Sequence, residues 1–218
     1  MYYGWQQTRS GPSIQEELNK ALSKILQEEI QCEAASRTDR GVHAEGQVVQ
    51  FYTDKQPSCP DLQKWLNGLL PKTIRVVEAK KVPLEFHPTL DAKSKIYHYY
   101  ITNAPVQDPF LAQTTWHYPY PLDLEKMRKA AKDLIGTHDF SKFTTDVRKN
   151  PICTLLKIDV VQLPDHRIRI ELTGDRFLYK MARRLSGTLA QIGAGKIKPN
   201  EVGVTAPPHG LFLYKINY

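Results

Sequence analysis

The stretch SKIYHYYIT, from Ser94 to Thr102, is the clearest strand signal in this chain of 218 residues. It is rich in aromatic and β-branched residues, which pack well on the pleated surface of a sheet. Side chains of a strand alternate between the two faces of its sheet. The stretch therefore predicts one face made of Tyr97, Tyr99 and Ile101 and another made of Ile96, His98 and Tyr100.

After this strand the pattern predicts a helix, a hairpin of two strands, a second helix and a last strand. The first helix begins after Asp123, a residue type that caps helices, and ends at Gly136. The hairpin covers Thr154 to Leu163 and Arg167 to Thr173, the second helix Phe177 to Ile192, and the last strand Leu211 to Tyr218. This order, β-α-β-β-α-β, is the split βαβ arrangement.

The first part of the chain has a similar order with one strand fewer. A helix begins at Ser13, because Ser13 and Glu16 form a capping box. The polar segment Ser36 to Gly46 predicts a loop. The other elements expected here are strands at Ile30 to Ala35 and Gln47 to Tyr52, a helix from near Asp61 to just before Pro71, and a strand at Ile74 to Val82.

These patterns predict an α+β protein with two similar halves, residues 1–92 and residues 93–218. The first half carries the polar loop, and the second carries the tyrosine-rich strand and a basic helix. The two sheets are expected to join side by side. One strand at the start of the first half is missing from this series.

The chain carries 30 Lys and Arg against 23 Asp and Glu, a formal net charge of +7. Such an excess suits a polyanionic partner such as nucleic acid. No stretch approaches the ~20 apolar residues of a membrane helix, and no secretory signal is evident, so a cytoplasmic protein is expected. Cys32, Cys59 and Cys153 lie far apart without a CxxC pair, which predicts free thiols.

The segment SRTDRGVH, from Ser36 to His43, is the densest polar segment of the chain and carries one carboxylate, Asp39. Cations beside a carboxylate favour its charged form, in which it can act as a nucleophile or base. The same residues also fit an Asx turn closed by Gly41, with its arginines in solvent. Both interpretations stay open on these residues alone.

The predicted helix from Phe177 carries positive charge at regular spacing. Arg176, Lys180 and Arg184 are four residues apart and predict one basic stripe that follows RNA phosphates. Arg183 falls off this line, at the boundary of the apolar side. It is either a surface residue that extends to solvent or an inward residue that pairs with a carboxylate.

Tyr97 has two interpretations as well. It packs in the core, or it stacks on an unpaired base, as tyrosines of basic proteins do. The histidines are scattered without the spacing of metal ligands, and no phosphate-binding glycine motif is present. The residues therefore give no support for a metal or an organic cofactor.

Several motifs along the chain occur together in one enzyme family. They are YGWQ at Tyr3, ASRTDRGVHAEGQVVQF at Ala35, FHP at Phe86, KSKIYHYYI at Lys93, HDFSKF at His138, FLYKMARRLSG at Phe177 and APPHGLFL at Ala206. In this order they resemble the tRNA pseudouridine synthase A family, over essentially the whole chain. The loop core RTDxGVHA is the most specific of them.

The resemblance implies roles for individual residues. Asp39 corresponds to the family's catalytic aspartate, Arg183 to the arginine that pairs with it, and Tyr97 to the active-site tyrosine. Leu211 corresponds to an apolar residue against the target base. The residues expected to contact the substrate or the rest of the RNA are Arg37, Arg40, His43, Tyr97, Arg176, Lys180, Arg184 and Leu211.

The resemblance also implies the pseudouridine synthase fold, with two ferredoxin-like halves and a joined antiparallel or mixed sheet. The implied reaction isomerises uridine to pseudouridine at positions 38, 39 and 40 of the tRNA anticodon arm, without a cofactor. The implied partners are tRNA and a second copy of the chain. Two departures are expected to matter: the family's first strand is absent before Tyr2, and the segment Gly195 to Val204 is shorter than usual.

Two rival functions agree less well with the sequence. A catalytically inactive tRNA-binding module would use the same basic surface, but it has no use for a carboxylate facing a polyanion. A base deaminase would need the HxE and PCxxC zinc ligands, and the sequence has neither.

Overall fold

The structure is a computed structural model that describes residues 2–146 and 150–218. The chain forms two units, one of Met1–Gly41 and Gln47–Asp91 and the other of Val42–Gly46 and Ala92–Tyr218. The sequence pattern predicted that the short segment Val42–Gly46 belongs to the first half. In the structure it groups with the second unit, because its strand pairs there.

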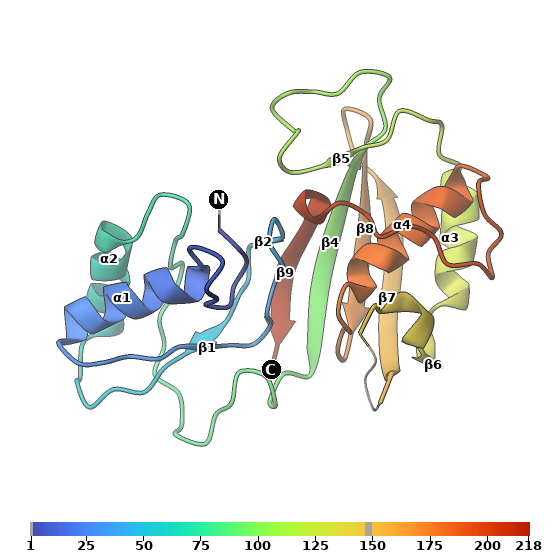
Figure 1. Cartoon of the computed structure of the whole chain (residues 1–218). Helices are drawn as coiled ribbons and strands as arrows, with labels where there is room; N and C mark the ends of the chain where they lie inside the picture. The colour runs from blue at the N-terminus through green and yellow to red at the C-terminus, as the bar shows by residue number, and fades with distance from the viewer. Residues whose placement is uncertain (1, 147–149) are drawn as a thin grey trace. The chain divides into compact units, whose positions relative to one another are not determined.

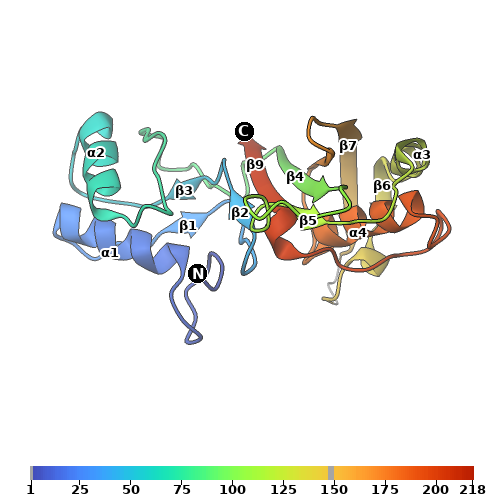
Figure 2. The ribbon, with the colours of Figure 1, turned by 90° about the horizontal axis from the view of Figure 1, so that it is seen from above.

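Two helices of the first unit begin where side-chain caps allow. Helix α1 spans Ile14–Leu26, and the hydroxyl of Ser13 accepts the Glu16 N–H at 3.2 Å, as the capping box predicts. Helix α2 spans Cys59–Leu69 and begins earlier than expected, because Ser58 caps it by accepting the Asp61 N–H at 3.2 Å. Figures 1 and 2 show α1 and α2 side by side.

The strands of the first unit are short. Strand β1, Glu33–Ala34, pairs antiparallel with β3, Val49–Gln50. The core beneath them consists of apolar side chains from the first unit's helices and loops: Trp5, Leu18, Ala21, Leu22, Leu26, Ile30, Cys32, Leu62, Leu66, Leu70 and Ile74. Both helices therefore direct apolar side chains into this core.

The strand predicted at Ile74 to Val82 is wrong, since this segment has no strand structure. Side chains of α2 satisfy its backbone instead. The amide of Asn67 accepts the Val76 N–H at 2.8 Å and donates to the Val76 carbonyl at 2.7 Å. Gln63 donates to the Val76 and Val77 carbonyls at 3.2 and 2.7 Å. If this segment were a strand, a neighbouring strand would have to make these bonds instead.

The second unit contains a mixed sheet in the order β2-β9-β4-β8-β7-β6, with β5 paired to β4. The long central strands are antiparallel, whereas β2 pairs parallel with β9 and β5 pairs parallel with β4. The strands are β2 His43–Ala44, β4 Ser94–Thr102, β5 Trp116–His117, β6 Gly136–Asp139, β7 Ile152–Gln162, β8 Arg167–Gly174 and β9 Leu211–Asn217. The predicted strand at Ser94 to Thr102 and the predicted hairpin are confirmed.

Helices α3, Leu124–Asp133, and α4, Met181–Gly193, pack on each other and on this sheet (Figure 1). Asp123 caps α3 by accepting the Lys126 N–H at 3.0 Å, as predicted. Gly193 permits the helices to approach, because a Cβ there would lie 2.6 Å from Cγ of Met127. The fold is thus α+β with a mixed sheet.

Candidate active site

Asp39 lies on an irregular loop of the first unit that leads from β1 toward β2. Asp39 is half-buried, whereas Arg37 and Arg40 are exposed. The guanidinium carbon of Arg40 lies 4.3 Å from the centre of the Tyr3 ring, in a cation–π contact. The loop therefore combines one partly sheltered carboxylate with two accessible arginines.

The backbone at Asp39 packs directly against Gly4. A Cβ on Gly4 would lie 2.8 Å from the Thr38 oxygen and 3.1 Å from both the Asp39 carbonyl carbon and the Arg40 nitrogen. Gly4 also has a φ of +102°, a conformation that glycine adopts easily. Next to it, the Trp5 N–H donates to the Thr38 carbonyl at 3.1 Å. The YGW segment thus determines the backbone path through the loop.

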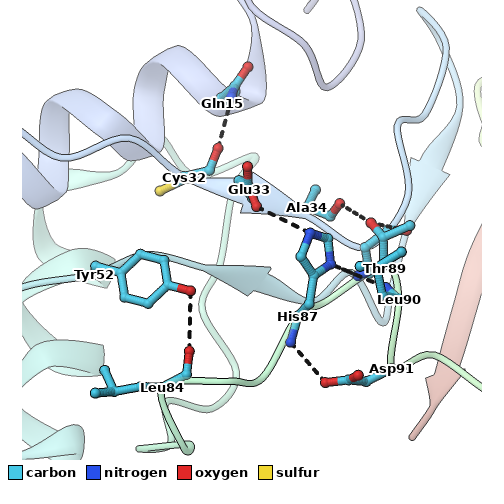
Figure 3. Close-up of polar contacts among 11 residues, drawn as sticks. Gln15, Cys32, Glu33, Ala34, Tyr52, Leu84, His87, Thr89, Leu90 and Asp91 are labelled. Carbon is cyan, nitrogen blue, oxygen red and sulfur yellow. Dashed lines mark hydrogen bonds and ion pairs between the residues drawn. The ribbon is translucent and has the colours of Figure 1, made fainter.

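The FHP turn supports the start of the same loop (Figure 3). The Thr89 hydroxyl donates to the Ala34 and Ala35 carbonyls at 3.2 and 3.5 Å. His87 organises the turn, because its Nδ1 accepts the Thr89 N–H at 3.1 Å. The proton of a neutral His87 ring is then on Nε2, which lies 3.7 Å from the Glu33 carboxylate. The end of β1 is therefore held in place.

Tyr97 lies on β4 of the second unit and is only 7% exposed. Its ring meets Phe177 edge to face, with centroids 4.9 Å apart. Its partner across the sheet is Leu213, and Tyr99 is the partner of Leu211, which is also buried. The position of Tyr97 agrees with core packing, and its role in base stacking stays a prediction.

Arg183 lies in the first turn of α4 and is half-buried. Its Nε donates to the Ala206 carbonyl at 2.8 Å, and the Ala206 N–H donates to the Arg183 carbonyl at 3.2 Å. Nearby, the Tyr99 hydroxyl donates to the Pro207 carbonyl at 2.9 Å. Burial raises the pKa of Tyr99 far above its usual value, against the opposing charge of Arg183. Tyr99 is therefore a neutral donor here.

Two histidines, His43 and His209, belong to the same unit as Arg183. The ring of His43 places Nε2 2.8 Å from the Gln113 carbonyl oxygen and stacks on Phe212. His209 belongs to the short helix η2, Pro208–Gly210. Burial lowers the pKa of His209, and the charges of His43 and Arg183 lower it further. His43 and Arg183 were predicted as site residues from the sequence. His209 was not, although it lies in the motif that begins APPHG.

The predicted basic stripe on one helix is wrong. Helix α4 begins at Met181, and Lys180 precedes it with a left-handed φ of 60°, so Arg176 lies outside the helix. Arg176 donates to the Asn150 and Ile152 carbonyls, and Arg184 donates to the Thr144 carbonyl at 3.1 Å. Both arginines thus bind backbone within the protein. Lys180 instead lies over the Tyr179 ring, 4.8 Å from its centre.

Cys32, Cys59 and Cys153 are free thiols, as predicted. Within residues 2–146 and 150–218, no three His, Cys, Asp or Glu side chains gather as the ligands of a metal ion would. In the same described ranges, no helix has the length and apolar character needed to cross a membrane.

Comparison with known proteins identifies the class. The model of a family described as tRNA pseudouridine synthase matches residues 2–91 and 130–218. The tRNA pseudouridine synthase A 2 of Protochlamydia amoebophila is 45% identical over 237 residues, covering 100% of this chain and 89% of that protein. The tRNA pseudouridine synthase A of Thermoanaerobacter sp. is 42% identical, covering 100% and 94%, and that of Thermotoga neapolitana is 35% identical, covering 99% and 94%.

An α+β chain with these matches is an RNA-modifying isomerase. The chain belongs to the tRNA pseudouridine synthase family. Enzymes of this family isomerise uridine to pseudouridine in tRNA, and the resemblance inferred from the motifs is thereby confirmed.

Proposed function

We propose that this chain isomerises uridines 38, 39 and 40 of the tRNA anticodon arm, with Asp39 as its catalytic carboxylate and no cofactor. One observation carries the proposal. Asp39 is a half-buried carboxylate on a loop whose backbone packs against Gly4, while the neighbouring Arg37 and Arg40 are exposed. A fixed carboxylate between accessible cations suits chemistry on a polyanion better than it suits binding alone.

The reaction breaks the bond between uracil N1 and the ribose, turns the base and joins it again through C5. The target must first leave the base stack, which costs a few kcal/mol and less near a loop. Asp39 then attacks the base, attacks C1′ or removes the C2′ proton. Each of these routes requires an ionised carboxylate with a fixed position.

Residues of both units supply the remaining roles. In the proposal Arg183 pairs with Asp39 through its planar guanidinium, and its Nε bond to Ala206 supports a fixed orientation. Tyr97 and Leu211 contact the flipped uracil, and Tyr97 assists removal of the C5 proton. Arg37, Arg40, His43 and Lys180 contact the RNA. Arg176 and Arg184 are left out of this set because they bind backbone carbonyls.

The architecture and assembly complete the proposal. The strand order β9-β4-β8-β7 with α3 and α4 supports a ferredoxin-like second half, and the first unit is the proposed counterpart. The enzyme acts in the cytoplasm as a homodimer that grips one tRNA. Its net charge of +7 supports binding to that polyanion.

The direct test is Asp39→Asn, which keeps the shape of the side chain and removes its ability to act as nucleophile or base. Pseudouridine should no longer form at positions 38, 39 and 40 of a tRNA transcript, while tRNA affinity stays within a few fold. Asp133→Asn, on the exposed end of α3, is the matched control and should keep full activity. Sustained turnover by Asp39→Asn would exclude this mechanism, and binding without modification by the unaltered protein would indicate an inactive tRNA-binding module.

A further inference from the structure

Gln47 is bonded twice to a single residue of the Asp39 loop. Its side-chain Nε2 donates to the Ser36 carbonyl at 2.6 Å, and its Oε1 accepts the Ser36 N–H at 3.3 Å. A primary amide is the side chain that offers both a donor and an acceptor in this geometry. Ser36 lies three residues before Asp39.

The amide of Gln47 takes the place of a strand partner. Ala34 pairs with Val49 in the β1–β3 ladder, and the Ala35 N–H donates to the Val48 carbonyl at 2.9 Å. The next pair along this antiparallel ladder would be Ser36 with Gln47. There the side chain of Gln47 makes both bonds to Ser36, and the preceding segment Val42–Gly46 belongs to the second unit.

Gln47 and Gly4 together restrict the loop on both sides of Arg37. Gln47 fixes the backbone at Ser36, and the Gly4 segment fixes it from Thr38 onward through the close backbone approach and the Trp5 bond. Only a short piece of chain lies between these two anchors. The position of the Asp39 Cα therefore depends on both anchors.

We propose that Gln47 is a positioning residue for catalysis, which acts by holding the loop that carries Asp39. The proposal rests on the proposed role of Asp39. A misplacement of about 1 Å at a reacting group can cost on the order of 10²-fold in rate. Loss of the amide should therefore lower the rate of the chemical step much more than it lowers tRNA affinity.

The test compares Gln47→Leu and Gln47→Glu with the unaltered protein. Leu removes both bonds, and Glu keeps the shape but places a second acceptor opposite the Ser36 carbonyl. We expect single-turnover rates at saturating enzyme to fall by roughly 10- to 100-fold in both variants, within the loss that such misplacement produces. The dissociation constant for tRNA should change by less than about threefold, because the neutral amide of Gln47 holds the loop in position and contributes no charge to RNA binding.

Gln63→Leu is the matched control. Gln63 also makes two hydrogen bonds from its side chain to backbone carbonyls in the first unit, at Val76 and Val77. Its loss should lower the melting temperature comparably and leave the single-turnover rate unchanged. A rate loss that merely follows thermal stability would then be the same in the Gln47 and Gln63 variants, and such a result would overturn the proposal.

Two outcomes separate this inference from the proposed function. An inactive Asp39→Asn beside Gln47 variants of normal single-turnover rate would refute the positioning role and keep the catalytic one. An active Asp39→Asn would refute the catalytic role, and with it the positioning of Asp39 by Gln47. Both roles would be supported if Asp39→Asn is inactive and the two Gln47 variants, Gln47→Leu and Gln47→Glu, react slowly but bind tRNA with normal affinity.

Discussion

We expect Arg176→Ala to destabilise the protein without changing how tRNA binding depends on salt. The Arg176 guanidinium donates to the Asn150 carbonyl at 2.9 Å and to the Ile152 carbonyl at 2.5 Å. Hydrogen bonds to charged groups contribute about 1.5–3 kcal/mol each when sheltered. Both bonds are solvent-exposed, so each should contribute less than this range, about 1 kcal/mol, and the variant should lose about 2 kcal/mol in all. For a chain of this size that is roughly 4–8 °C in melting temperature.

The assay pairs this variant with Lys180→Gln. Lys180 lies over the Tyr179 ring at 4.8 Å and remains a proposed phosphate contact. Its neutral replacement should reduce the slope of log affinity against log salt by ~0.7–0.9 for one lost phosphate contact. Its melting temperature should stay close to that of the unaltered protein. Thermal unfolding and tRNA titrations at several salt concentrations measure both quantities for both variants.

The opposite pattern would refute the structural role of Arg176. If Arg176→Ala keeps its melting temperature and shows the shallower salt slope, the arginine contacts RNA and its bonds to the backbone contribute nothing. Arg176 would then be the RNA contact that the spacing of Arg176, Lys180 and Arg184 predicts.

Two further predictions concern stability. A Cβ on Gly187 would lie 2.0 Å from the Val204 oxygen, so Gly187→Ala should lower the free energy of unfolding by about 1–3 kcal/mol or more. A Cβ on Gly68 would have no atom within 4 Å, so Gly68→Ala should instead stabilise α2 by ~0.5–1 kcal/mol. Equal effects of the two substitutions in denaturant unfolding would contradict this. Burial, and secondarily the charge of Arg169, lower the pKa of His98, despite the opposing attraction of a carboxylate 3.3 Å away. The unfolded chain therefore binds the proton more readily, so stability should fall as pH drops below about 6.5, the usual histidine value. His98→Gln should flatten that decline in melting temperature between pH 7.5 and 5.5, and an unchanged profile would exclude His98 as its source.

Local signals in the sequence were sufficient for several elements. The capping box at Ser13, the cap at Asp123 and the alternation from Ser94 to Thr102 each act within a few residues, and each element is present. The failure at Ile74 to Val82 has a non-local cause. Its backbone groups are satisfied by side chains of α2, and no pattern within the segment itself reports that.

The candidate site also combines residues that a local sequence signal predicts with residues that have no such signal. The density of polar residues drew attention to Asp39 and its arginines, and the motif resemblance gave Asp39 its catalytic role. The residues that hold the loop, Gly4 and Gln47, lie elsewhere in the chain or act through a side-chain geometry that has no periodic signature. Motif membership was their only signal in the sequence.

Arg183 shows how two separate motifs form one physical arrangement. The sequence offered two interpretations of this arginine, as a surface residue or as an inward partner of a carboxylate. In the structure its Nε bonds to the Ala206 carbonyl, and the Ala206 N–H bonds back to the arginine's own carbonyl. This exchange requires the segment before APPHG to lie against α4. Gly187, one turn further along the helix, leaves room for that segment, because a Cβ there would lie 2.0 Å from the Val204 oxygen. Gly187, the glycine of RRLSG, therefore contributes to the orientation of Arg183. A side chain at this position would push Val204 away, and the Ala206 carbonyl could then not approach the guanidinium closely enough to hold it.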